Sequence, residues 1–264
     1  MNKNAILITG ASGGLGKACV KMAQHLDIDW IIASDLEKPT FNQKNMLNFE
    51  LDVRSEEQIL HLRSELESQN IVVKYLINNA GLFDFFPISE ATEDLLDKSI
   101  KVNVYGPILV TSVFKDHLAK TKGRVIQISS VSVKLPILFM PYPNTKIALE
   151  AFSTSMRQEL AVLGVKLIII RPGAMDTNLI REVKNVKNPN SNSRFQKEFN
   201  RFQKIAQNDV GKIVAPEKVA RLIQKAIQSK HPKRIYSINK NRKIGIVLLF
   251  PIWLRDKLIV KQIK

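Results

Sequence analysis

The feature that most constrains the fold lies at the amino terminus, where a short apolar run passes through a glycine-rich turn into a helical pattern. The run is Ala5-Ile-Leu-Ile, the turn is Thr9-Gly-Ala-Ser-Gly-Gly-Leu-Gly16, and apolar residues at helical spacing continue to Leu26. Glycines permit a tight turn and a close approach of ligand to backbone, and the amino end of a helix stabilises negative charge. This order predicts a strand, a turn and a helix that together bind a phosphate group.

An acidic residue follows the turn at the distance expected in dinucleotide-binding folds. The next apolar run, Trp30-Ile-Ile-Ala-Ser, ends at Asp35, 19 residues after Gly16. A carboxylate at this place accepts hydrogen bonds from an adenosine ribose and repels a phosphate there, which predicts NAD as the cofactor. Lys17 and Lys38 lie nearby in the sequence, so NADP is the alternative.

A phenol and an ammonium stand four positions apart in Tyr142-Pro-Asn-Thr-Lys146, at the start of a predicted helix. This spacing places both groups on one helix face, and an adjacent cation stabilises a phenolate, so Tyr142 is a candidate general acid or base. Upstream, residues 123–130 read as a buried strand that ends in hydroxyls, which predicts that Ser130 binds a substrate oxygen. Tyr236 and Lys240 repeat the spacing, but no hydroxyl-ended strand precedes them.

Together these segments resemble the short-chain dehydrogenase/reductase family over nearly the whole chain. The matching motifs, in order, are Thr9 to Gly16, Asp52-Val53, Asn78-Asn79-Ala80-Gly81, Asn103, Ser130, Tyr142 with Lys146, and Arg171-Pro172-Gly173 followed by Thr177. The 12-residue step from Ser130 to Tyr142 is similar to that of the retinol and hydroxysteroid dehydrogenase branch. Pro141 and Pro143 bracket the tyrosine; proline is tolerated in a first helical turn, so we expect altered local geometry in an active enzyme.

The resemblance implies roles for individual residues. Ser130 would orient the substrate oxygen, Tyr142 would transfer a proton, Lys146 would lower the tyrosine pKa and bind the nicotinamide ribose, and Asn103 would support a water in a proton relay. The residues that the resemblance and the glycine turn assign to the cofactor are Gly10, Ser12, Gly13, Gly14, Leu15, Gly16, Asp35, Leu36, Asp52, Val53, Asn79, Ala80, Gly81, Tyr142, Lys146, Pro172, Gly173 and Thr177.

Length and composition favour one domain. A chain of 264 residues with 45% hydrophobic content and alternating strand and helix patterns predicts a single doubly wound, Rossmann-type α/β domain, with a parallel sheet flanked by helices, over residues 1–243. The polar stretch 178–210 reads as a lid or as a solvated insertion. The four histidines lack metal-ligand spacing, so no metal is expected. The single Cys19 reads as packed, and the chain passes from Met1 straight into the first strand, which favours a cytoplasmic protein without a signal peptide.

The excess of positive over negative charge lies in the last third of the chain. The net charge is +16, and residues 181–264 hold 21 Lys/Arg against 5 Asp/Glu. Within them, residues 244–254 form an apolar run that is too short to span a bilayer, and residues 244–264 are predicted to form a basic, apolar carboxyl-terminal segment. Three interpretations of this segment stay open. It could bind peripherally to the anionic inner face of a membrane, or it could pack on the domain or serve as a substrate lid. Nucleic-acid binding is the third interpretation, and it is disfavoured because aromatic binding motifs are lacking.

The loops near the predicted site are apolar, which favours a lipophilic alcohol or ketone of retinoid, steroid or fatty type as substrate. We therefore expect an oxidoreductase that moves hydride between a nicotinamide and an alcohol or carbonyl carbon. The alternative is a catalytically idle, cofactor-binding scaffold at a membrane surface. The family resemblance also implies a homodimer or homotetramer formed through the helices around residues 98–120 and 145–163.

Overall fold

A computed structural model of the protein describes residues 2–176, 188–208, 213–239 and 242–264. Its centre is a parallel seven-stranded sheet with the order β3-β2-β1-β4-β5-β6-β7. The strands are β1 (Lys3–Thr9), β2 (Trp30–Asp35), β3 (Met46–Glu50), β4 (Ile71–Asn78), β5 (Arg124–Ile128), β6 (Lys166–Pro172) and β7 (Ile235–Ile238). This confirms the predicted doubly wound α/β fold.

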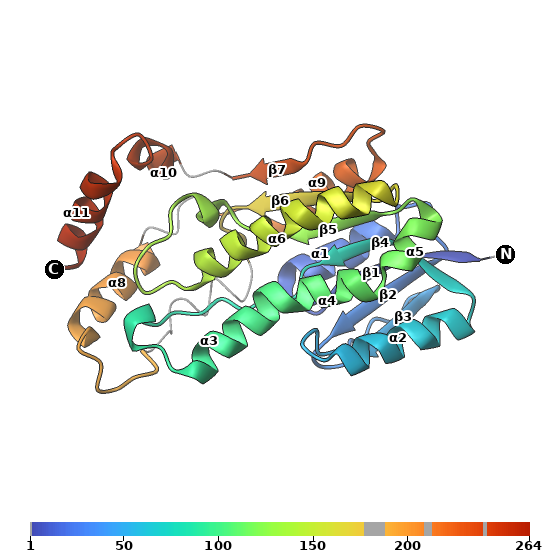
Figure 1. The fold of residues 1–264 in the computed structure, drawn as a ribbon, viewed down its shortest axis with the longest axis horizontal. Coiled ribbons are helices and arrows are strands. Elements are labelled where there is room, and N and C mark those ends of the chain that lie inside the picture. The colour runs from blue at the N-terminus through green and yellow to red at the C-terminus, as the bar shows by residue number, and fades with distance from the viewer. Residues whose placement is uncertain (1, 177–187, 209–212, 240–241) are drawn as a thin grey trace.

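Helices cover both faces of the sheet, and the central strands are therefore apolar on both sides. In β1, Ile6 and Ile8 face one core while Leu7 faces the other, as the two-residue period of a strand requires. The first core is completed by α1 (Gly14–Ala23) and α9 (Pro216–Gln228). The second is covered by α2 (Glu56–Ser68), α4 (Gly106–Val113), α5 (Lys115–Thr121) and α6 (Tyr142–Val162), which lie in front of the sheet in Figure 1.

One long helical rod is interrupted by an irregular turn. α3 (Glu93–Ile100) continues through a π-helical turn, Lys101–Tyr105, directly into α4. Such turns admit an extra residue into a helix and often occur at functional sites. Short 3₁₀ turns at Ile88–Glu90 and Val131–Lys134 follow β4 and β5.

The remaining helices gather at one end of the molecule. α8 (Gln196–Asn208), α10 (Arg242–Val247) and α11 (Ile252–Ile263) lie at the left end of Figure 1, beyond the strand carboxyl ends and opposite the amino terminus. The apolar run 244–254 is not one continuous helix, because Pro251 caps the start of α11 and separates it from α10. None of the helices within the described ranges has both the length and the apolar character needed to span a bilayer.

Candidate active site

The candidate site lies where the carboxyl ends of β1 and β4 meet, because the chain leaves these neighbouring strands in opposite directions. Such switch points are the usual ligand sites of open α/β sheets. Hydrogen bonds lock the two strand ends together: the Thr9 hydroxyl accepts from the backbone N–H groups of Asn79 and Ala80, each at 3.1 Å. The Asn79 amide donates to the carbonyls of Thr9 at 3.1 Å and Gly10 at 2.9 Å. Asn79 and Ala80 thereby form one wall of the glycine turn.

The glycine turn requires glycine for two measurable reasons. Gly10 has φ +65°, a conformation that side chains rarely adopt, and a Cβ there would lie 2.8 Å from the Cα of Ala80. A Cβ on Gly16 would lie 2.0 Å from the Gly10 carbonyl oxygen, so α1 could not pack so closely beneath the turn. Both glycines are therefore structural requirements of the loop that precedes α1.

The first turn of α1 is open to an anion. Among the described residues, no side chain caps the helix at Gly13, and its first turn holds no acidic residue. In α2, by contrast, Ser55 accepts a hydrogen bond from Gln58 N–H, and Glu56 and Glu57 occupy the first turn. Helix amino ends carry unsatisfied N–H groups and partial positive charge. The start of α1, with Gly13, Gly14, Leu15 and Gly16, thus fits the pyrophosphate of a dinucleotide.

Asp35 borders a cavity beside this turn. The cavity measures about 470 Å³ and is lined by Ser12, Lys17, Asp35, Leu36, Glu37, Lys38, Pro39, Thr40 and Phe41. The Asp35 carboxylate accepts from Ser12 N–H and Leu36 N–H, both at 2.8 Å, which orients it at the end of β2. The structure therefore brings Ser12, Asp35 and Leu36 together, with two lysines at the same cavity.

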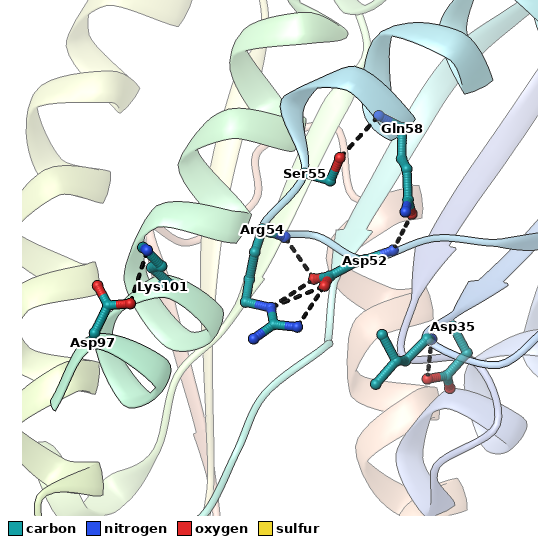
Figure 2. Close-up of polar contacts among 8 residues, drawn as sticks. Asp35, Asp52, Arg54, Ser55, Gln58, Asp97 and Lys101 are labelled. Atoms are coloured by element: carbon teal, nitrogen blue, oxygen red, sulfur yellow. Dashed lines mark hydrogen bonds and ion pairs between the residues drawn. The ribbon is translucent and has the colours of Figure 1, made fainter. Parts of the chain in front are cut away.

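Asp52 is held by Arg54, an arrangement that the motif alone does not reveal (Figure 2). The Arg54 guanidinium donates to both carboxylate oxygens at 2.6–2.9 Å, and the hydrogen bonds lower the pKa of Asp52 below its ordinary value. The Leu51 N–H donates to the Asp35 carbonyl at 2.7 Å, so Asp52 follows directly beside the end of β2. Val53 is buried, and a Cβ on Gly106 would lie 2.7 Å from its Cγ2 atom, so Val53 packs on the start of α4.

Gly81, Asn103 and Lys146 converge at the other side of the site. A Cβ on Gly81 would lie 3.1 Å from the Asn103 Oδ1 atom and 3.5 Å from the Lys146 Nζ atom. Asn103, buried in the π-helical turn, accepts from Leu82 N–H at 2.8 Å and donates to the Leu82 carbonyl at 2.9 Å. An amide keeps one further hydrogen and one further lone pair after two such bonds, which suits a bound water. The glycine here leaves a cradle that any side chain would fill.

Lys146 is buried, and its Nζ donates to the Ile128 carbonyl at 3.1 Å and lies 5.6 Å from the ring centroid of Tyr142. Burial lowers the pKa of the Lys146 ammonium to about 8, because the charged form loses its hydration. The amine therefore remains mostly charged at neutral pH.

Burial also raises the pKa of Tyr142 above its ordinary value, and a hydrogen bond with Ser130 opposes this shift. The predicted lowering of the tyrosine pKa by Lys146 is not the dominant effect in this structure, because loss of hydration disfavours the phenolate more strongly than Ser130 stabilises it. The resident form of Tyr142 is the neutral phenol, which is a proton donor. Ser130 itself accepts from Ser132 N–H at 3.1 Å and hydrogen-bonds the Ser132 hydroxyl at 2.8 Å.

A polar network that the motifs do not reveal lies next to the candidate catalytic groups. The Ser129 hydroxyl donates to Glu150, which also accepts from Arg171, with Nε to Oε1 at 2.8 Å. The network joins the end of β5, the helix that carries Tyr142 and Lys146, and β6. Glu150 follows Lys146 by one helical turn, the one sequence signal that places it under the site.

An aromatic cluster adjoins the candidate catalytic tyrosine. The Phe83 ring contacts Tyr142 edge to face with a centroid distance of 4.7 Å, and Phe83 contacts Phe85 at 4.9 Å. Phe85 continues the contacts to Phe202 of α8 at 6.0 Å. We call this set the phenylalanine cluster; its buried members are Phe85, Phe139, Phe199, Phe202 and Ile263, with Phe83, Ile137, Leu138, Met140, Phe195 and Ala206 partly buried around them.

Other predicted positions are placed as follows. Pro172 ends β6, and Gly173 N–H donates to the Ile238 carbonyl at 2.9 Å, so both lie at the same edge of the sheet as Ser130. Thr177 lies outside the described residues, as do residues 178–187 and 209–210 of the predicted lid 178–210. Tyr236 is on β7, and its hydroxyl accepts from Lys233 N–H at 3.0 Å. Buried Cys19 has its pKa raised to about 12 by loss of hydration, as expected of a packed thiol.

Known proteins of similar sequence are dehydrogenases and reductases. The short chain dehydrogenase family model matches residues 4–188. Estradiol 17-beta-dehydrogenase 2 of Rattus norvegicus is 31% identical, over 89% of this chain and 68% of its own length. The NADPH-dependent 3-dehydrocapnine reductase of Ornithobacterium rhinotracheale is 29% identical, over 98% of this chain and 96% of its own.

Solved structures share the fold. A short-chain dehydrogenase from Streptomyces avermitilis superposes with a TM-score of 0.74 at 23% identity, covering 98% of this chain and 95% of its own. One from Burkholderia cenocepacia, in complex with NADP, gives 0.74 at 21% identity and covers 100% and 98%.

Proposed function

Because the chain belongs to the short-chain dehydrogenase family, in its hydroxysteroid dehydrogenase-like branch, and is an NAD(P)-dependent oxidoreductase that interconverts an alcohol and a carbonyl, we propose that its substrate is lipophilic and that Tyr142 exchanges the proton. The observation that carries the proposal is the convergence of Tyr142, Ser130 and Lys146 at one sheet edge, with Phe83 against the phenol. The nicotinamide, when bound, supplies the hydride chemistry.

The proposed roles follow from the contacts of each side chain. Tyr142, as a neutral phenol, donates its proton to the oxygen of the carbonyl in reduction and takes it back in oxidation. Ser130, which hydrogen-bonds the phenol, orients the same oxygen. Lys146 places positive charge beside the ring, and Asn103 retains hydrogen-bonding capacity for a water next to Gly81.

We propose that the cofactor lies along the open amino end of α1, with its adenosine ribose at the cavity bordered by Asp35. The uncapped first turn of α1 and the cradle at Gly81 support this. By the family resemblance, Asp52 and Val53 would flank the adenine. Pro172 and Gly173 lie at the same sheet edge, while the role of Thr177 rests on the motif alone.

For the choice of nucleotide we propose NAD, and substitution of Asp35 tests it. Asp35→Ser removes the carboxylate that would accept from the ribose and repel a phosphate. We expect NAD affinity to fall by about ten-fold or more, the value of a hydrogen bond to a charged group, and NADP affinity to rise because Lys17 and Lys38 line the same cavity. Fluorescence titration of both reduced cofactors measures this. Glu37→Gln, which removes a different carboxylate from the lining of the same cavity, is the control, and tighter binding of NADP by the unmodified protein would overturn the assignment.

The proposed substrate class rests on the phenylalanine cluster. The cluster contacts the phenol of Tyr142 through Phe83. A hydroxyl-rich substrate would need hydrogen-bonding groups beside Tyr142 instead of aromatic side chains. The name of the rat relative specifies estradiol, a steroid, which supports the same class. A screen of steroid, retinoid and long-chain alcohols and ketones, followed by absorbance of the reduced nicotinamide, tests it. Turnover confined to sugars or other polar alcohols would contradict it.

We also propose a homodimer or homotetramer built on the π-helical turn, α4 and α6. Apolar side chains are exposed on this face, namely Ile100, Tyr105, Ile147 and Phe152. A charge at the centre of such a contact is left unpaired on burial, so Phe152→Glu is expected to yield monomers in sedimentation velocity. Leu60→Glu, at an exposed leucine of α2, is the matched control and should leave the oligomer intact. An unchanged sedimentation coefficient in Phe152→Glu would rule out this face.

A further inference from the structure

Several large apolar side chains are exposed where α10 turns into α11. Leu249 is 83% exposed, Ile252 69%, Trp253 66% and Ile246 60%. Together with the exposed Phe250, these residues form what we call the α10–α11 corner. Contiguous apolar surface of this kind marks a site of contact with another molecule or a membrane.

Backbone contacts hold the turn between α10 and α11 with its apolar side chains facing the solvent. Pro251 caps α11, and the Arg255 Nε donates to the Phe250 carbonyl at 2.8 Å across the turn. The side chain of Arg255 is therefore directed back to the backbone, while Leu249, Ile252 and Trp253 remain in solvent. Figure 1 shows α10 and α11 at one end of the molecule, and the exposed fractions of Leu249, Ile252 and Trp253 show that the other described elements leave these side chains uncovered.

Exposed lysines follow the corner along α11. Lys257, Lys261 and Lys264 are exposed, and Asp256 is the acidic residue of the helix. Two copies of the corner brought together would place like charges against each other, which disfavours self-association. An anionic bilayer attracts the lysines and accepts the apolar side chains, and tryptophan is enriched at the depth of the headgroups.

The same unit reaches the candidate active site through the phenylalanine cluster. Ile263, at the end of α11, is buried in that cluster, and the Arg201 Nη1 of α8 donates to its carbonyl at 3.4 Å. Phe202 of α8 contacts Phe85, which contacts Phe83 and through it Tyr142. Apolar contacts thus run from the catalytic phenol to the helix that carries the corner.

We infer that the α10–α11 corner inserts into the interface of an anionic bilayer and holds the phenylalanine cluster against the lipid, so that a lipophilic substrate enters from the membrane. At twelve residues, α11 is about 18 Å long, shorter than the hydrocarbon core of about 30 Å, so it lies in the interface. Membrane binding stands on the corner alone, whereas substrate entry from lipid rests on the proposed function.

Co-sedimentation with vesicles tests the binding step. The full-length protein is expected to bind vesicles of phosphatidylglycerol and phosphatidylcholine more tightly than pure phosphatidylcholine, and to bind less as salt rises. Leu249→Ser/Ile252→Ser/Trp253→Ser should lower partitioning at least about ten-fold, since three apolar side chains no longer insert. The control Leu60→Ser/Val162→Ser removes exposed apolar groups elsewhere and should bind as the parent does. Equal binding of the triple variant, or no binding by the parent at low salt, would overturn the inference.

Tryptophan quenching by brominated lipid gives an independent readout, because the chain has two tryptophans. Trp253 is at the corner, whereas Trp30 packs against the core on β2. Quenching of tryptophan fluorescence by brominated lipid in the vesicles should disappear in Trp253→Phe and persist in Trp30→Phe. Quenching that survives Trp253→Phe would contradict insertion at this corner. The inference would also be contradicted if the parent protein bound no vesicles and the triple variant changed from oligomer to monomer. That result would make the corner a contact between protein copies.

Activity separates this inference from the proposed function. With a short, water-soluble ketone, the triple serine variant should turn over like the parent protein. With a long-chain ketone dissolved in the vesicles, its rate should fall in proportion to its lost binding. Equal rates of parent and variant on the vesicle-borne ketone would reject entry from lipid, whereas absence of turnover with either ketone in the parent would count against the proposed function and leave the binding results valid.

Discussion

Tyr142→Phe is expected to lower kcat by about a hundred- to ten-thousand-fold, the usual contribution of a positioned proton donor. The substitution removes the hydroxyl that Ser130 hydrogen-bonds and leaves the ring that contacts Phe83 and lies beside Lys146. Affinity for the cofactor should change little, because the ring volume is retained. Steady-state rates with a substrate found in the screen, together with a binding titration of the reduced cofactor, measure both effects.

Tyr236→Phe is the matched control, because Tyr236 has the same spacing to a lysine in the sequence. Its hydroxyl accepts a hydrogen bond from Lys233 N–H on the edge strand β7, away from Ser130 and Lys146. Activity should therefore survive this change. Near-normal turnover in Tyr142→Phe would exclude the proposed proton transfer, whereas cofactor binding without any turnover in the unmodified protein would favour the catalytically idle scaffold.

Lys146→Met is expected to have opposite effects on activity and on stability. Loss of the ammonium removes the charge beside the Tyr142 ring and the group proposed to hold the nicotinamide ribose, so both kcat and cofactor affinity should fall. The free energy of unfolding at pH 7 should rise, because the fold keeps an ammonium whose pKa is lowered from 10.5 to about 8, a penalty of about 3 kcal/mol. Loss of the hydrogen bond to the Ile128 carbonyl offsets about 1 kcal/mol of this gain.

The sign of the pH dependence checks the stability effect. Between about pH 8 and 10.5 the unfolded chain binds the proton of Lys146 and the folded chain does not. The destabilisation caused by the buried ammonium is therefore complete below about pH 8 and decreases as the pH rises towards 10.5. The melting temperature of cofactor-free Lys146→Met should exceed that of the parent by roughly 4 °C at pH 7, and by less near pH 10. Lys115→Met, at an exposed lysine, should show no such difference. A variant that melts below the parent at pH 7 would mean that the ammonium stabilises the fold.

The parts of the fold set by local pattern were predictable from the sequence. β1, the glycine turn and α1 follow from an apolar run, glycines at fixed places and helical spacing, each of which acts within a few residues. The predicted strand before Ser130 is β5, and the predicted helix after Tyr142 is α6, which begins at the tyrosine despite its flanking prolines. Pro143 lies in the first turn, where the missing N–H has no partner to lose.

Features that depend on distant contacts were not predictable. Arg54 reaches back to Asp52, and the family motif contains no signal for that ion pair. Glu150 meets Arg171 and Ser129 only because α6 crosses the ends of β5 and β6. The tyrosine pKa depends on how much water the folded chain excludes from the hydroxyl, which a spacing of four residues does not reveal.

The sequence alone did not determine how the segment that forms the α10–α11 corner folds. The sequence has one apolar run over residues 244–254, and Pro251 could have ended a helix, bent it or begun one. In the structure it begins α11, which divides the run between an exposed corner and a helix that ends in the phenylalanine cluster at Ile263. Packing on the domain and contact with a membrane are therefore compatible for this segment.

The π-helical turn at Lys101–Tyr105 makes the site sensitive to the number of residues in the rod as well as to their identity. A π turn accommodates one residue more than the regular helix around it. Deleting one residue there would leave a regular helix without the bulge that presents Asn103 to the site. Asn103 would then leave the backbone of Leu82 and the cradle at Gly81, although every other side chain of the site were retained. Insertions and deletions in this rod are thus constrained by geometry in a way that point substitutions on its solvent face are not.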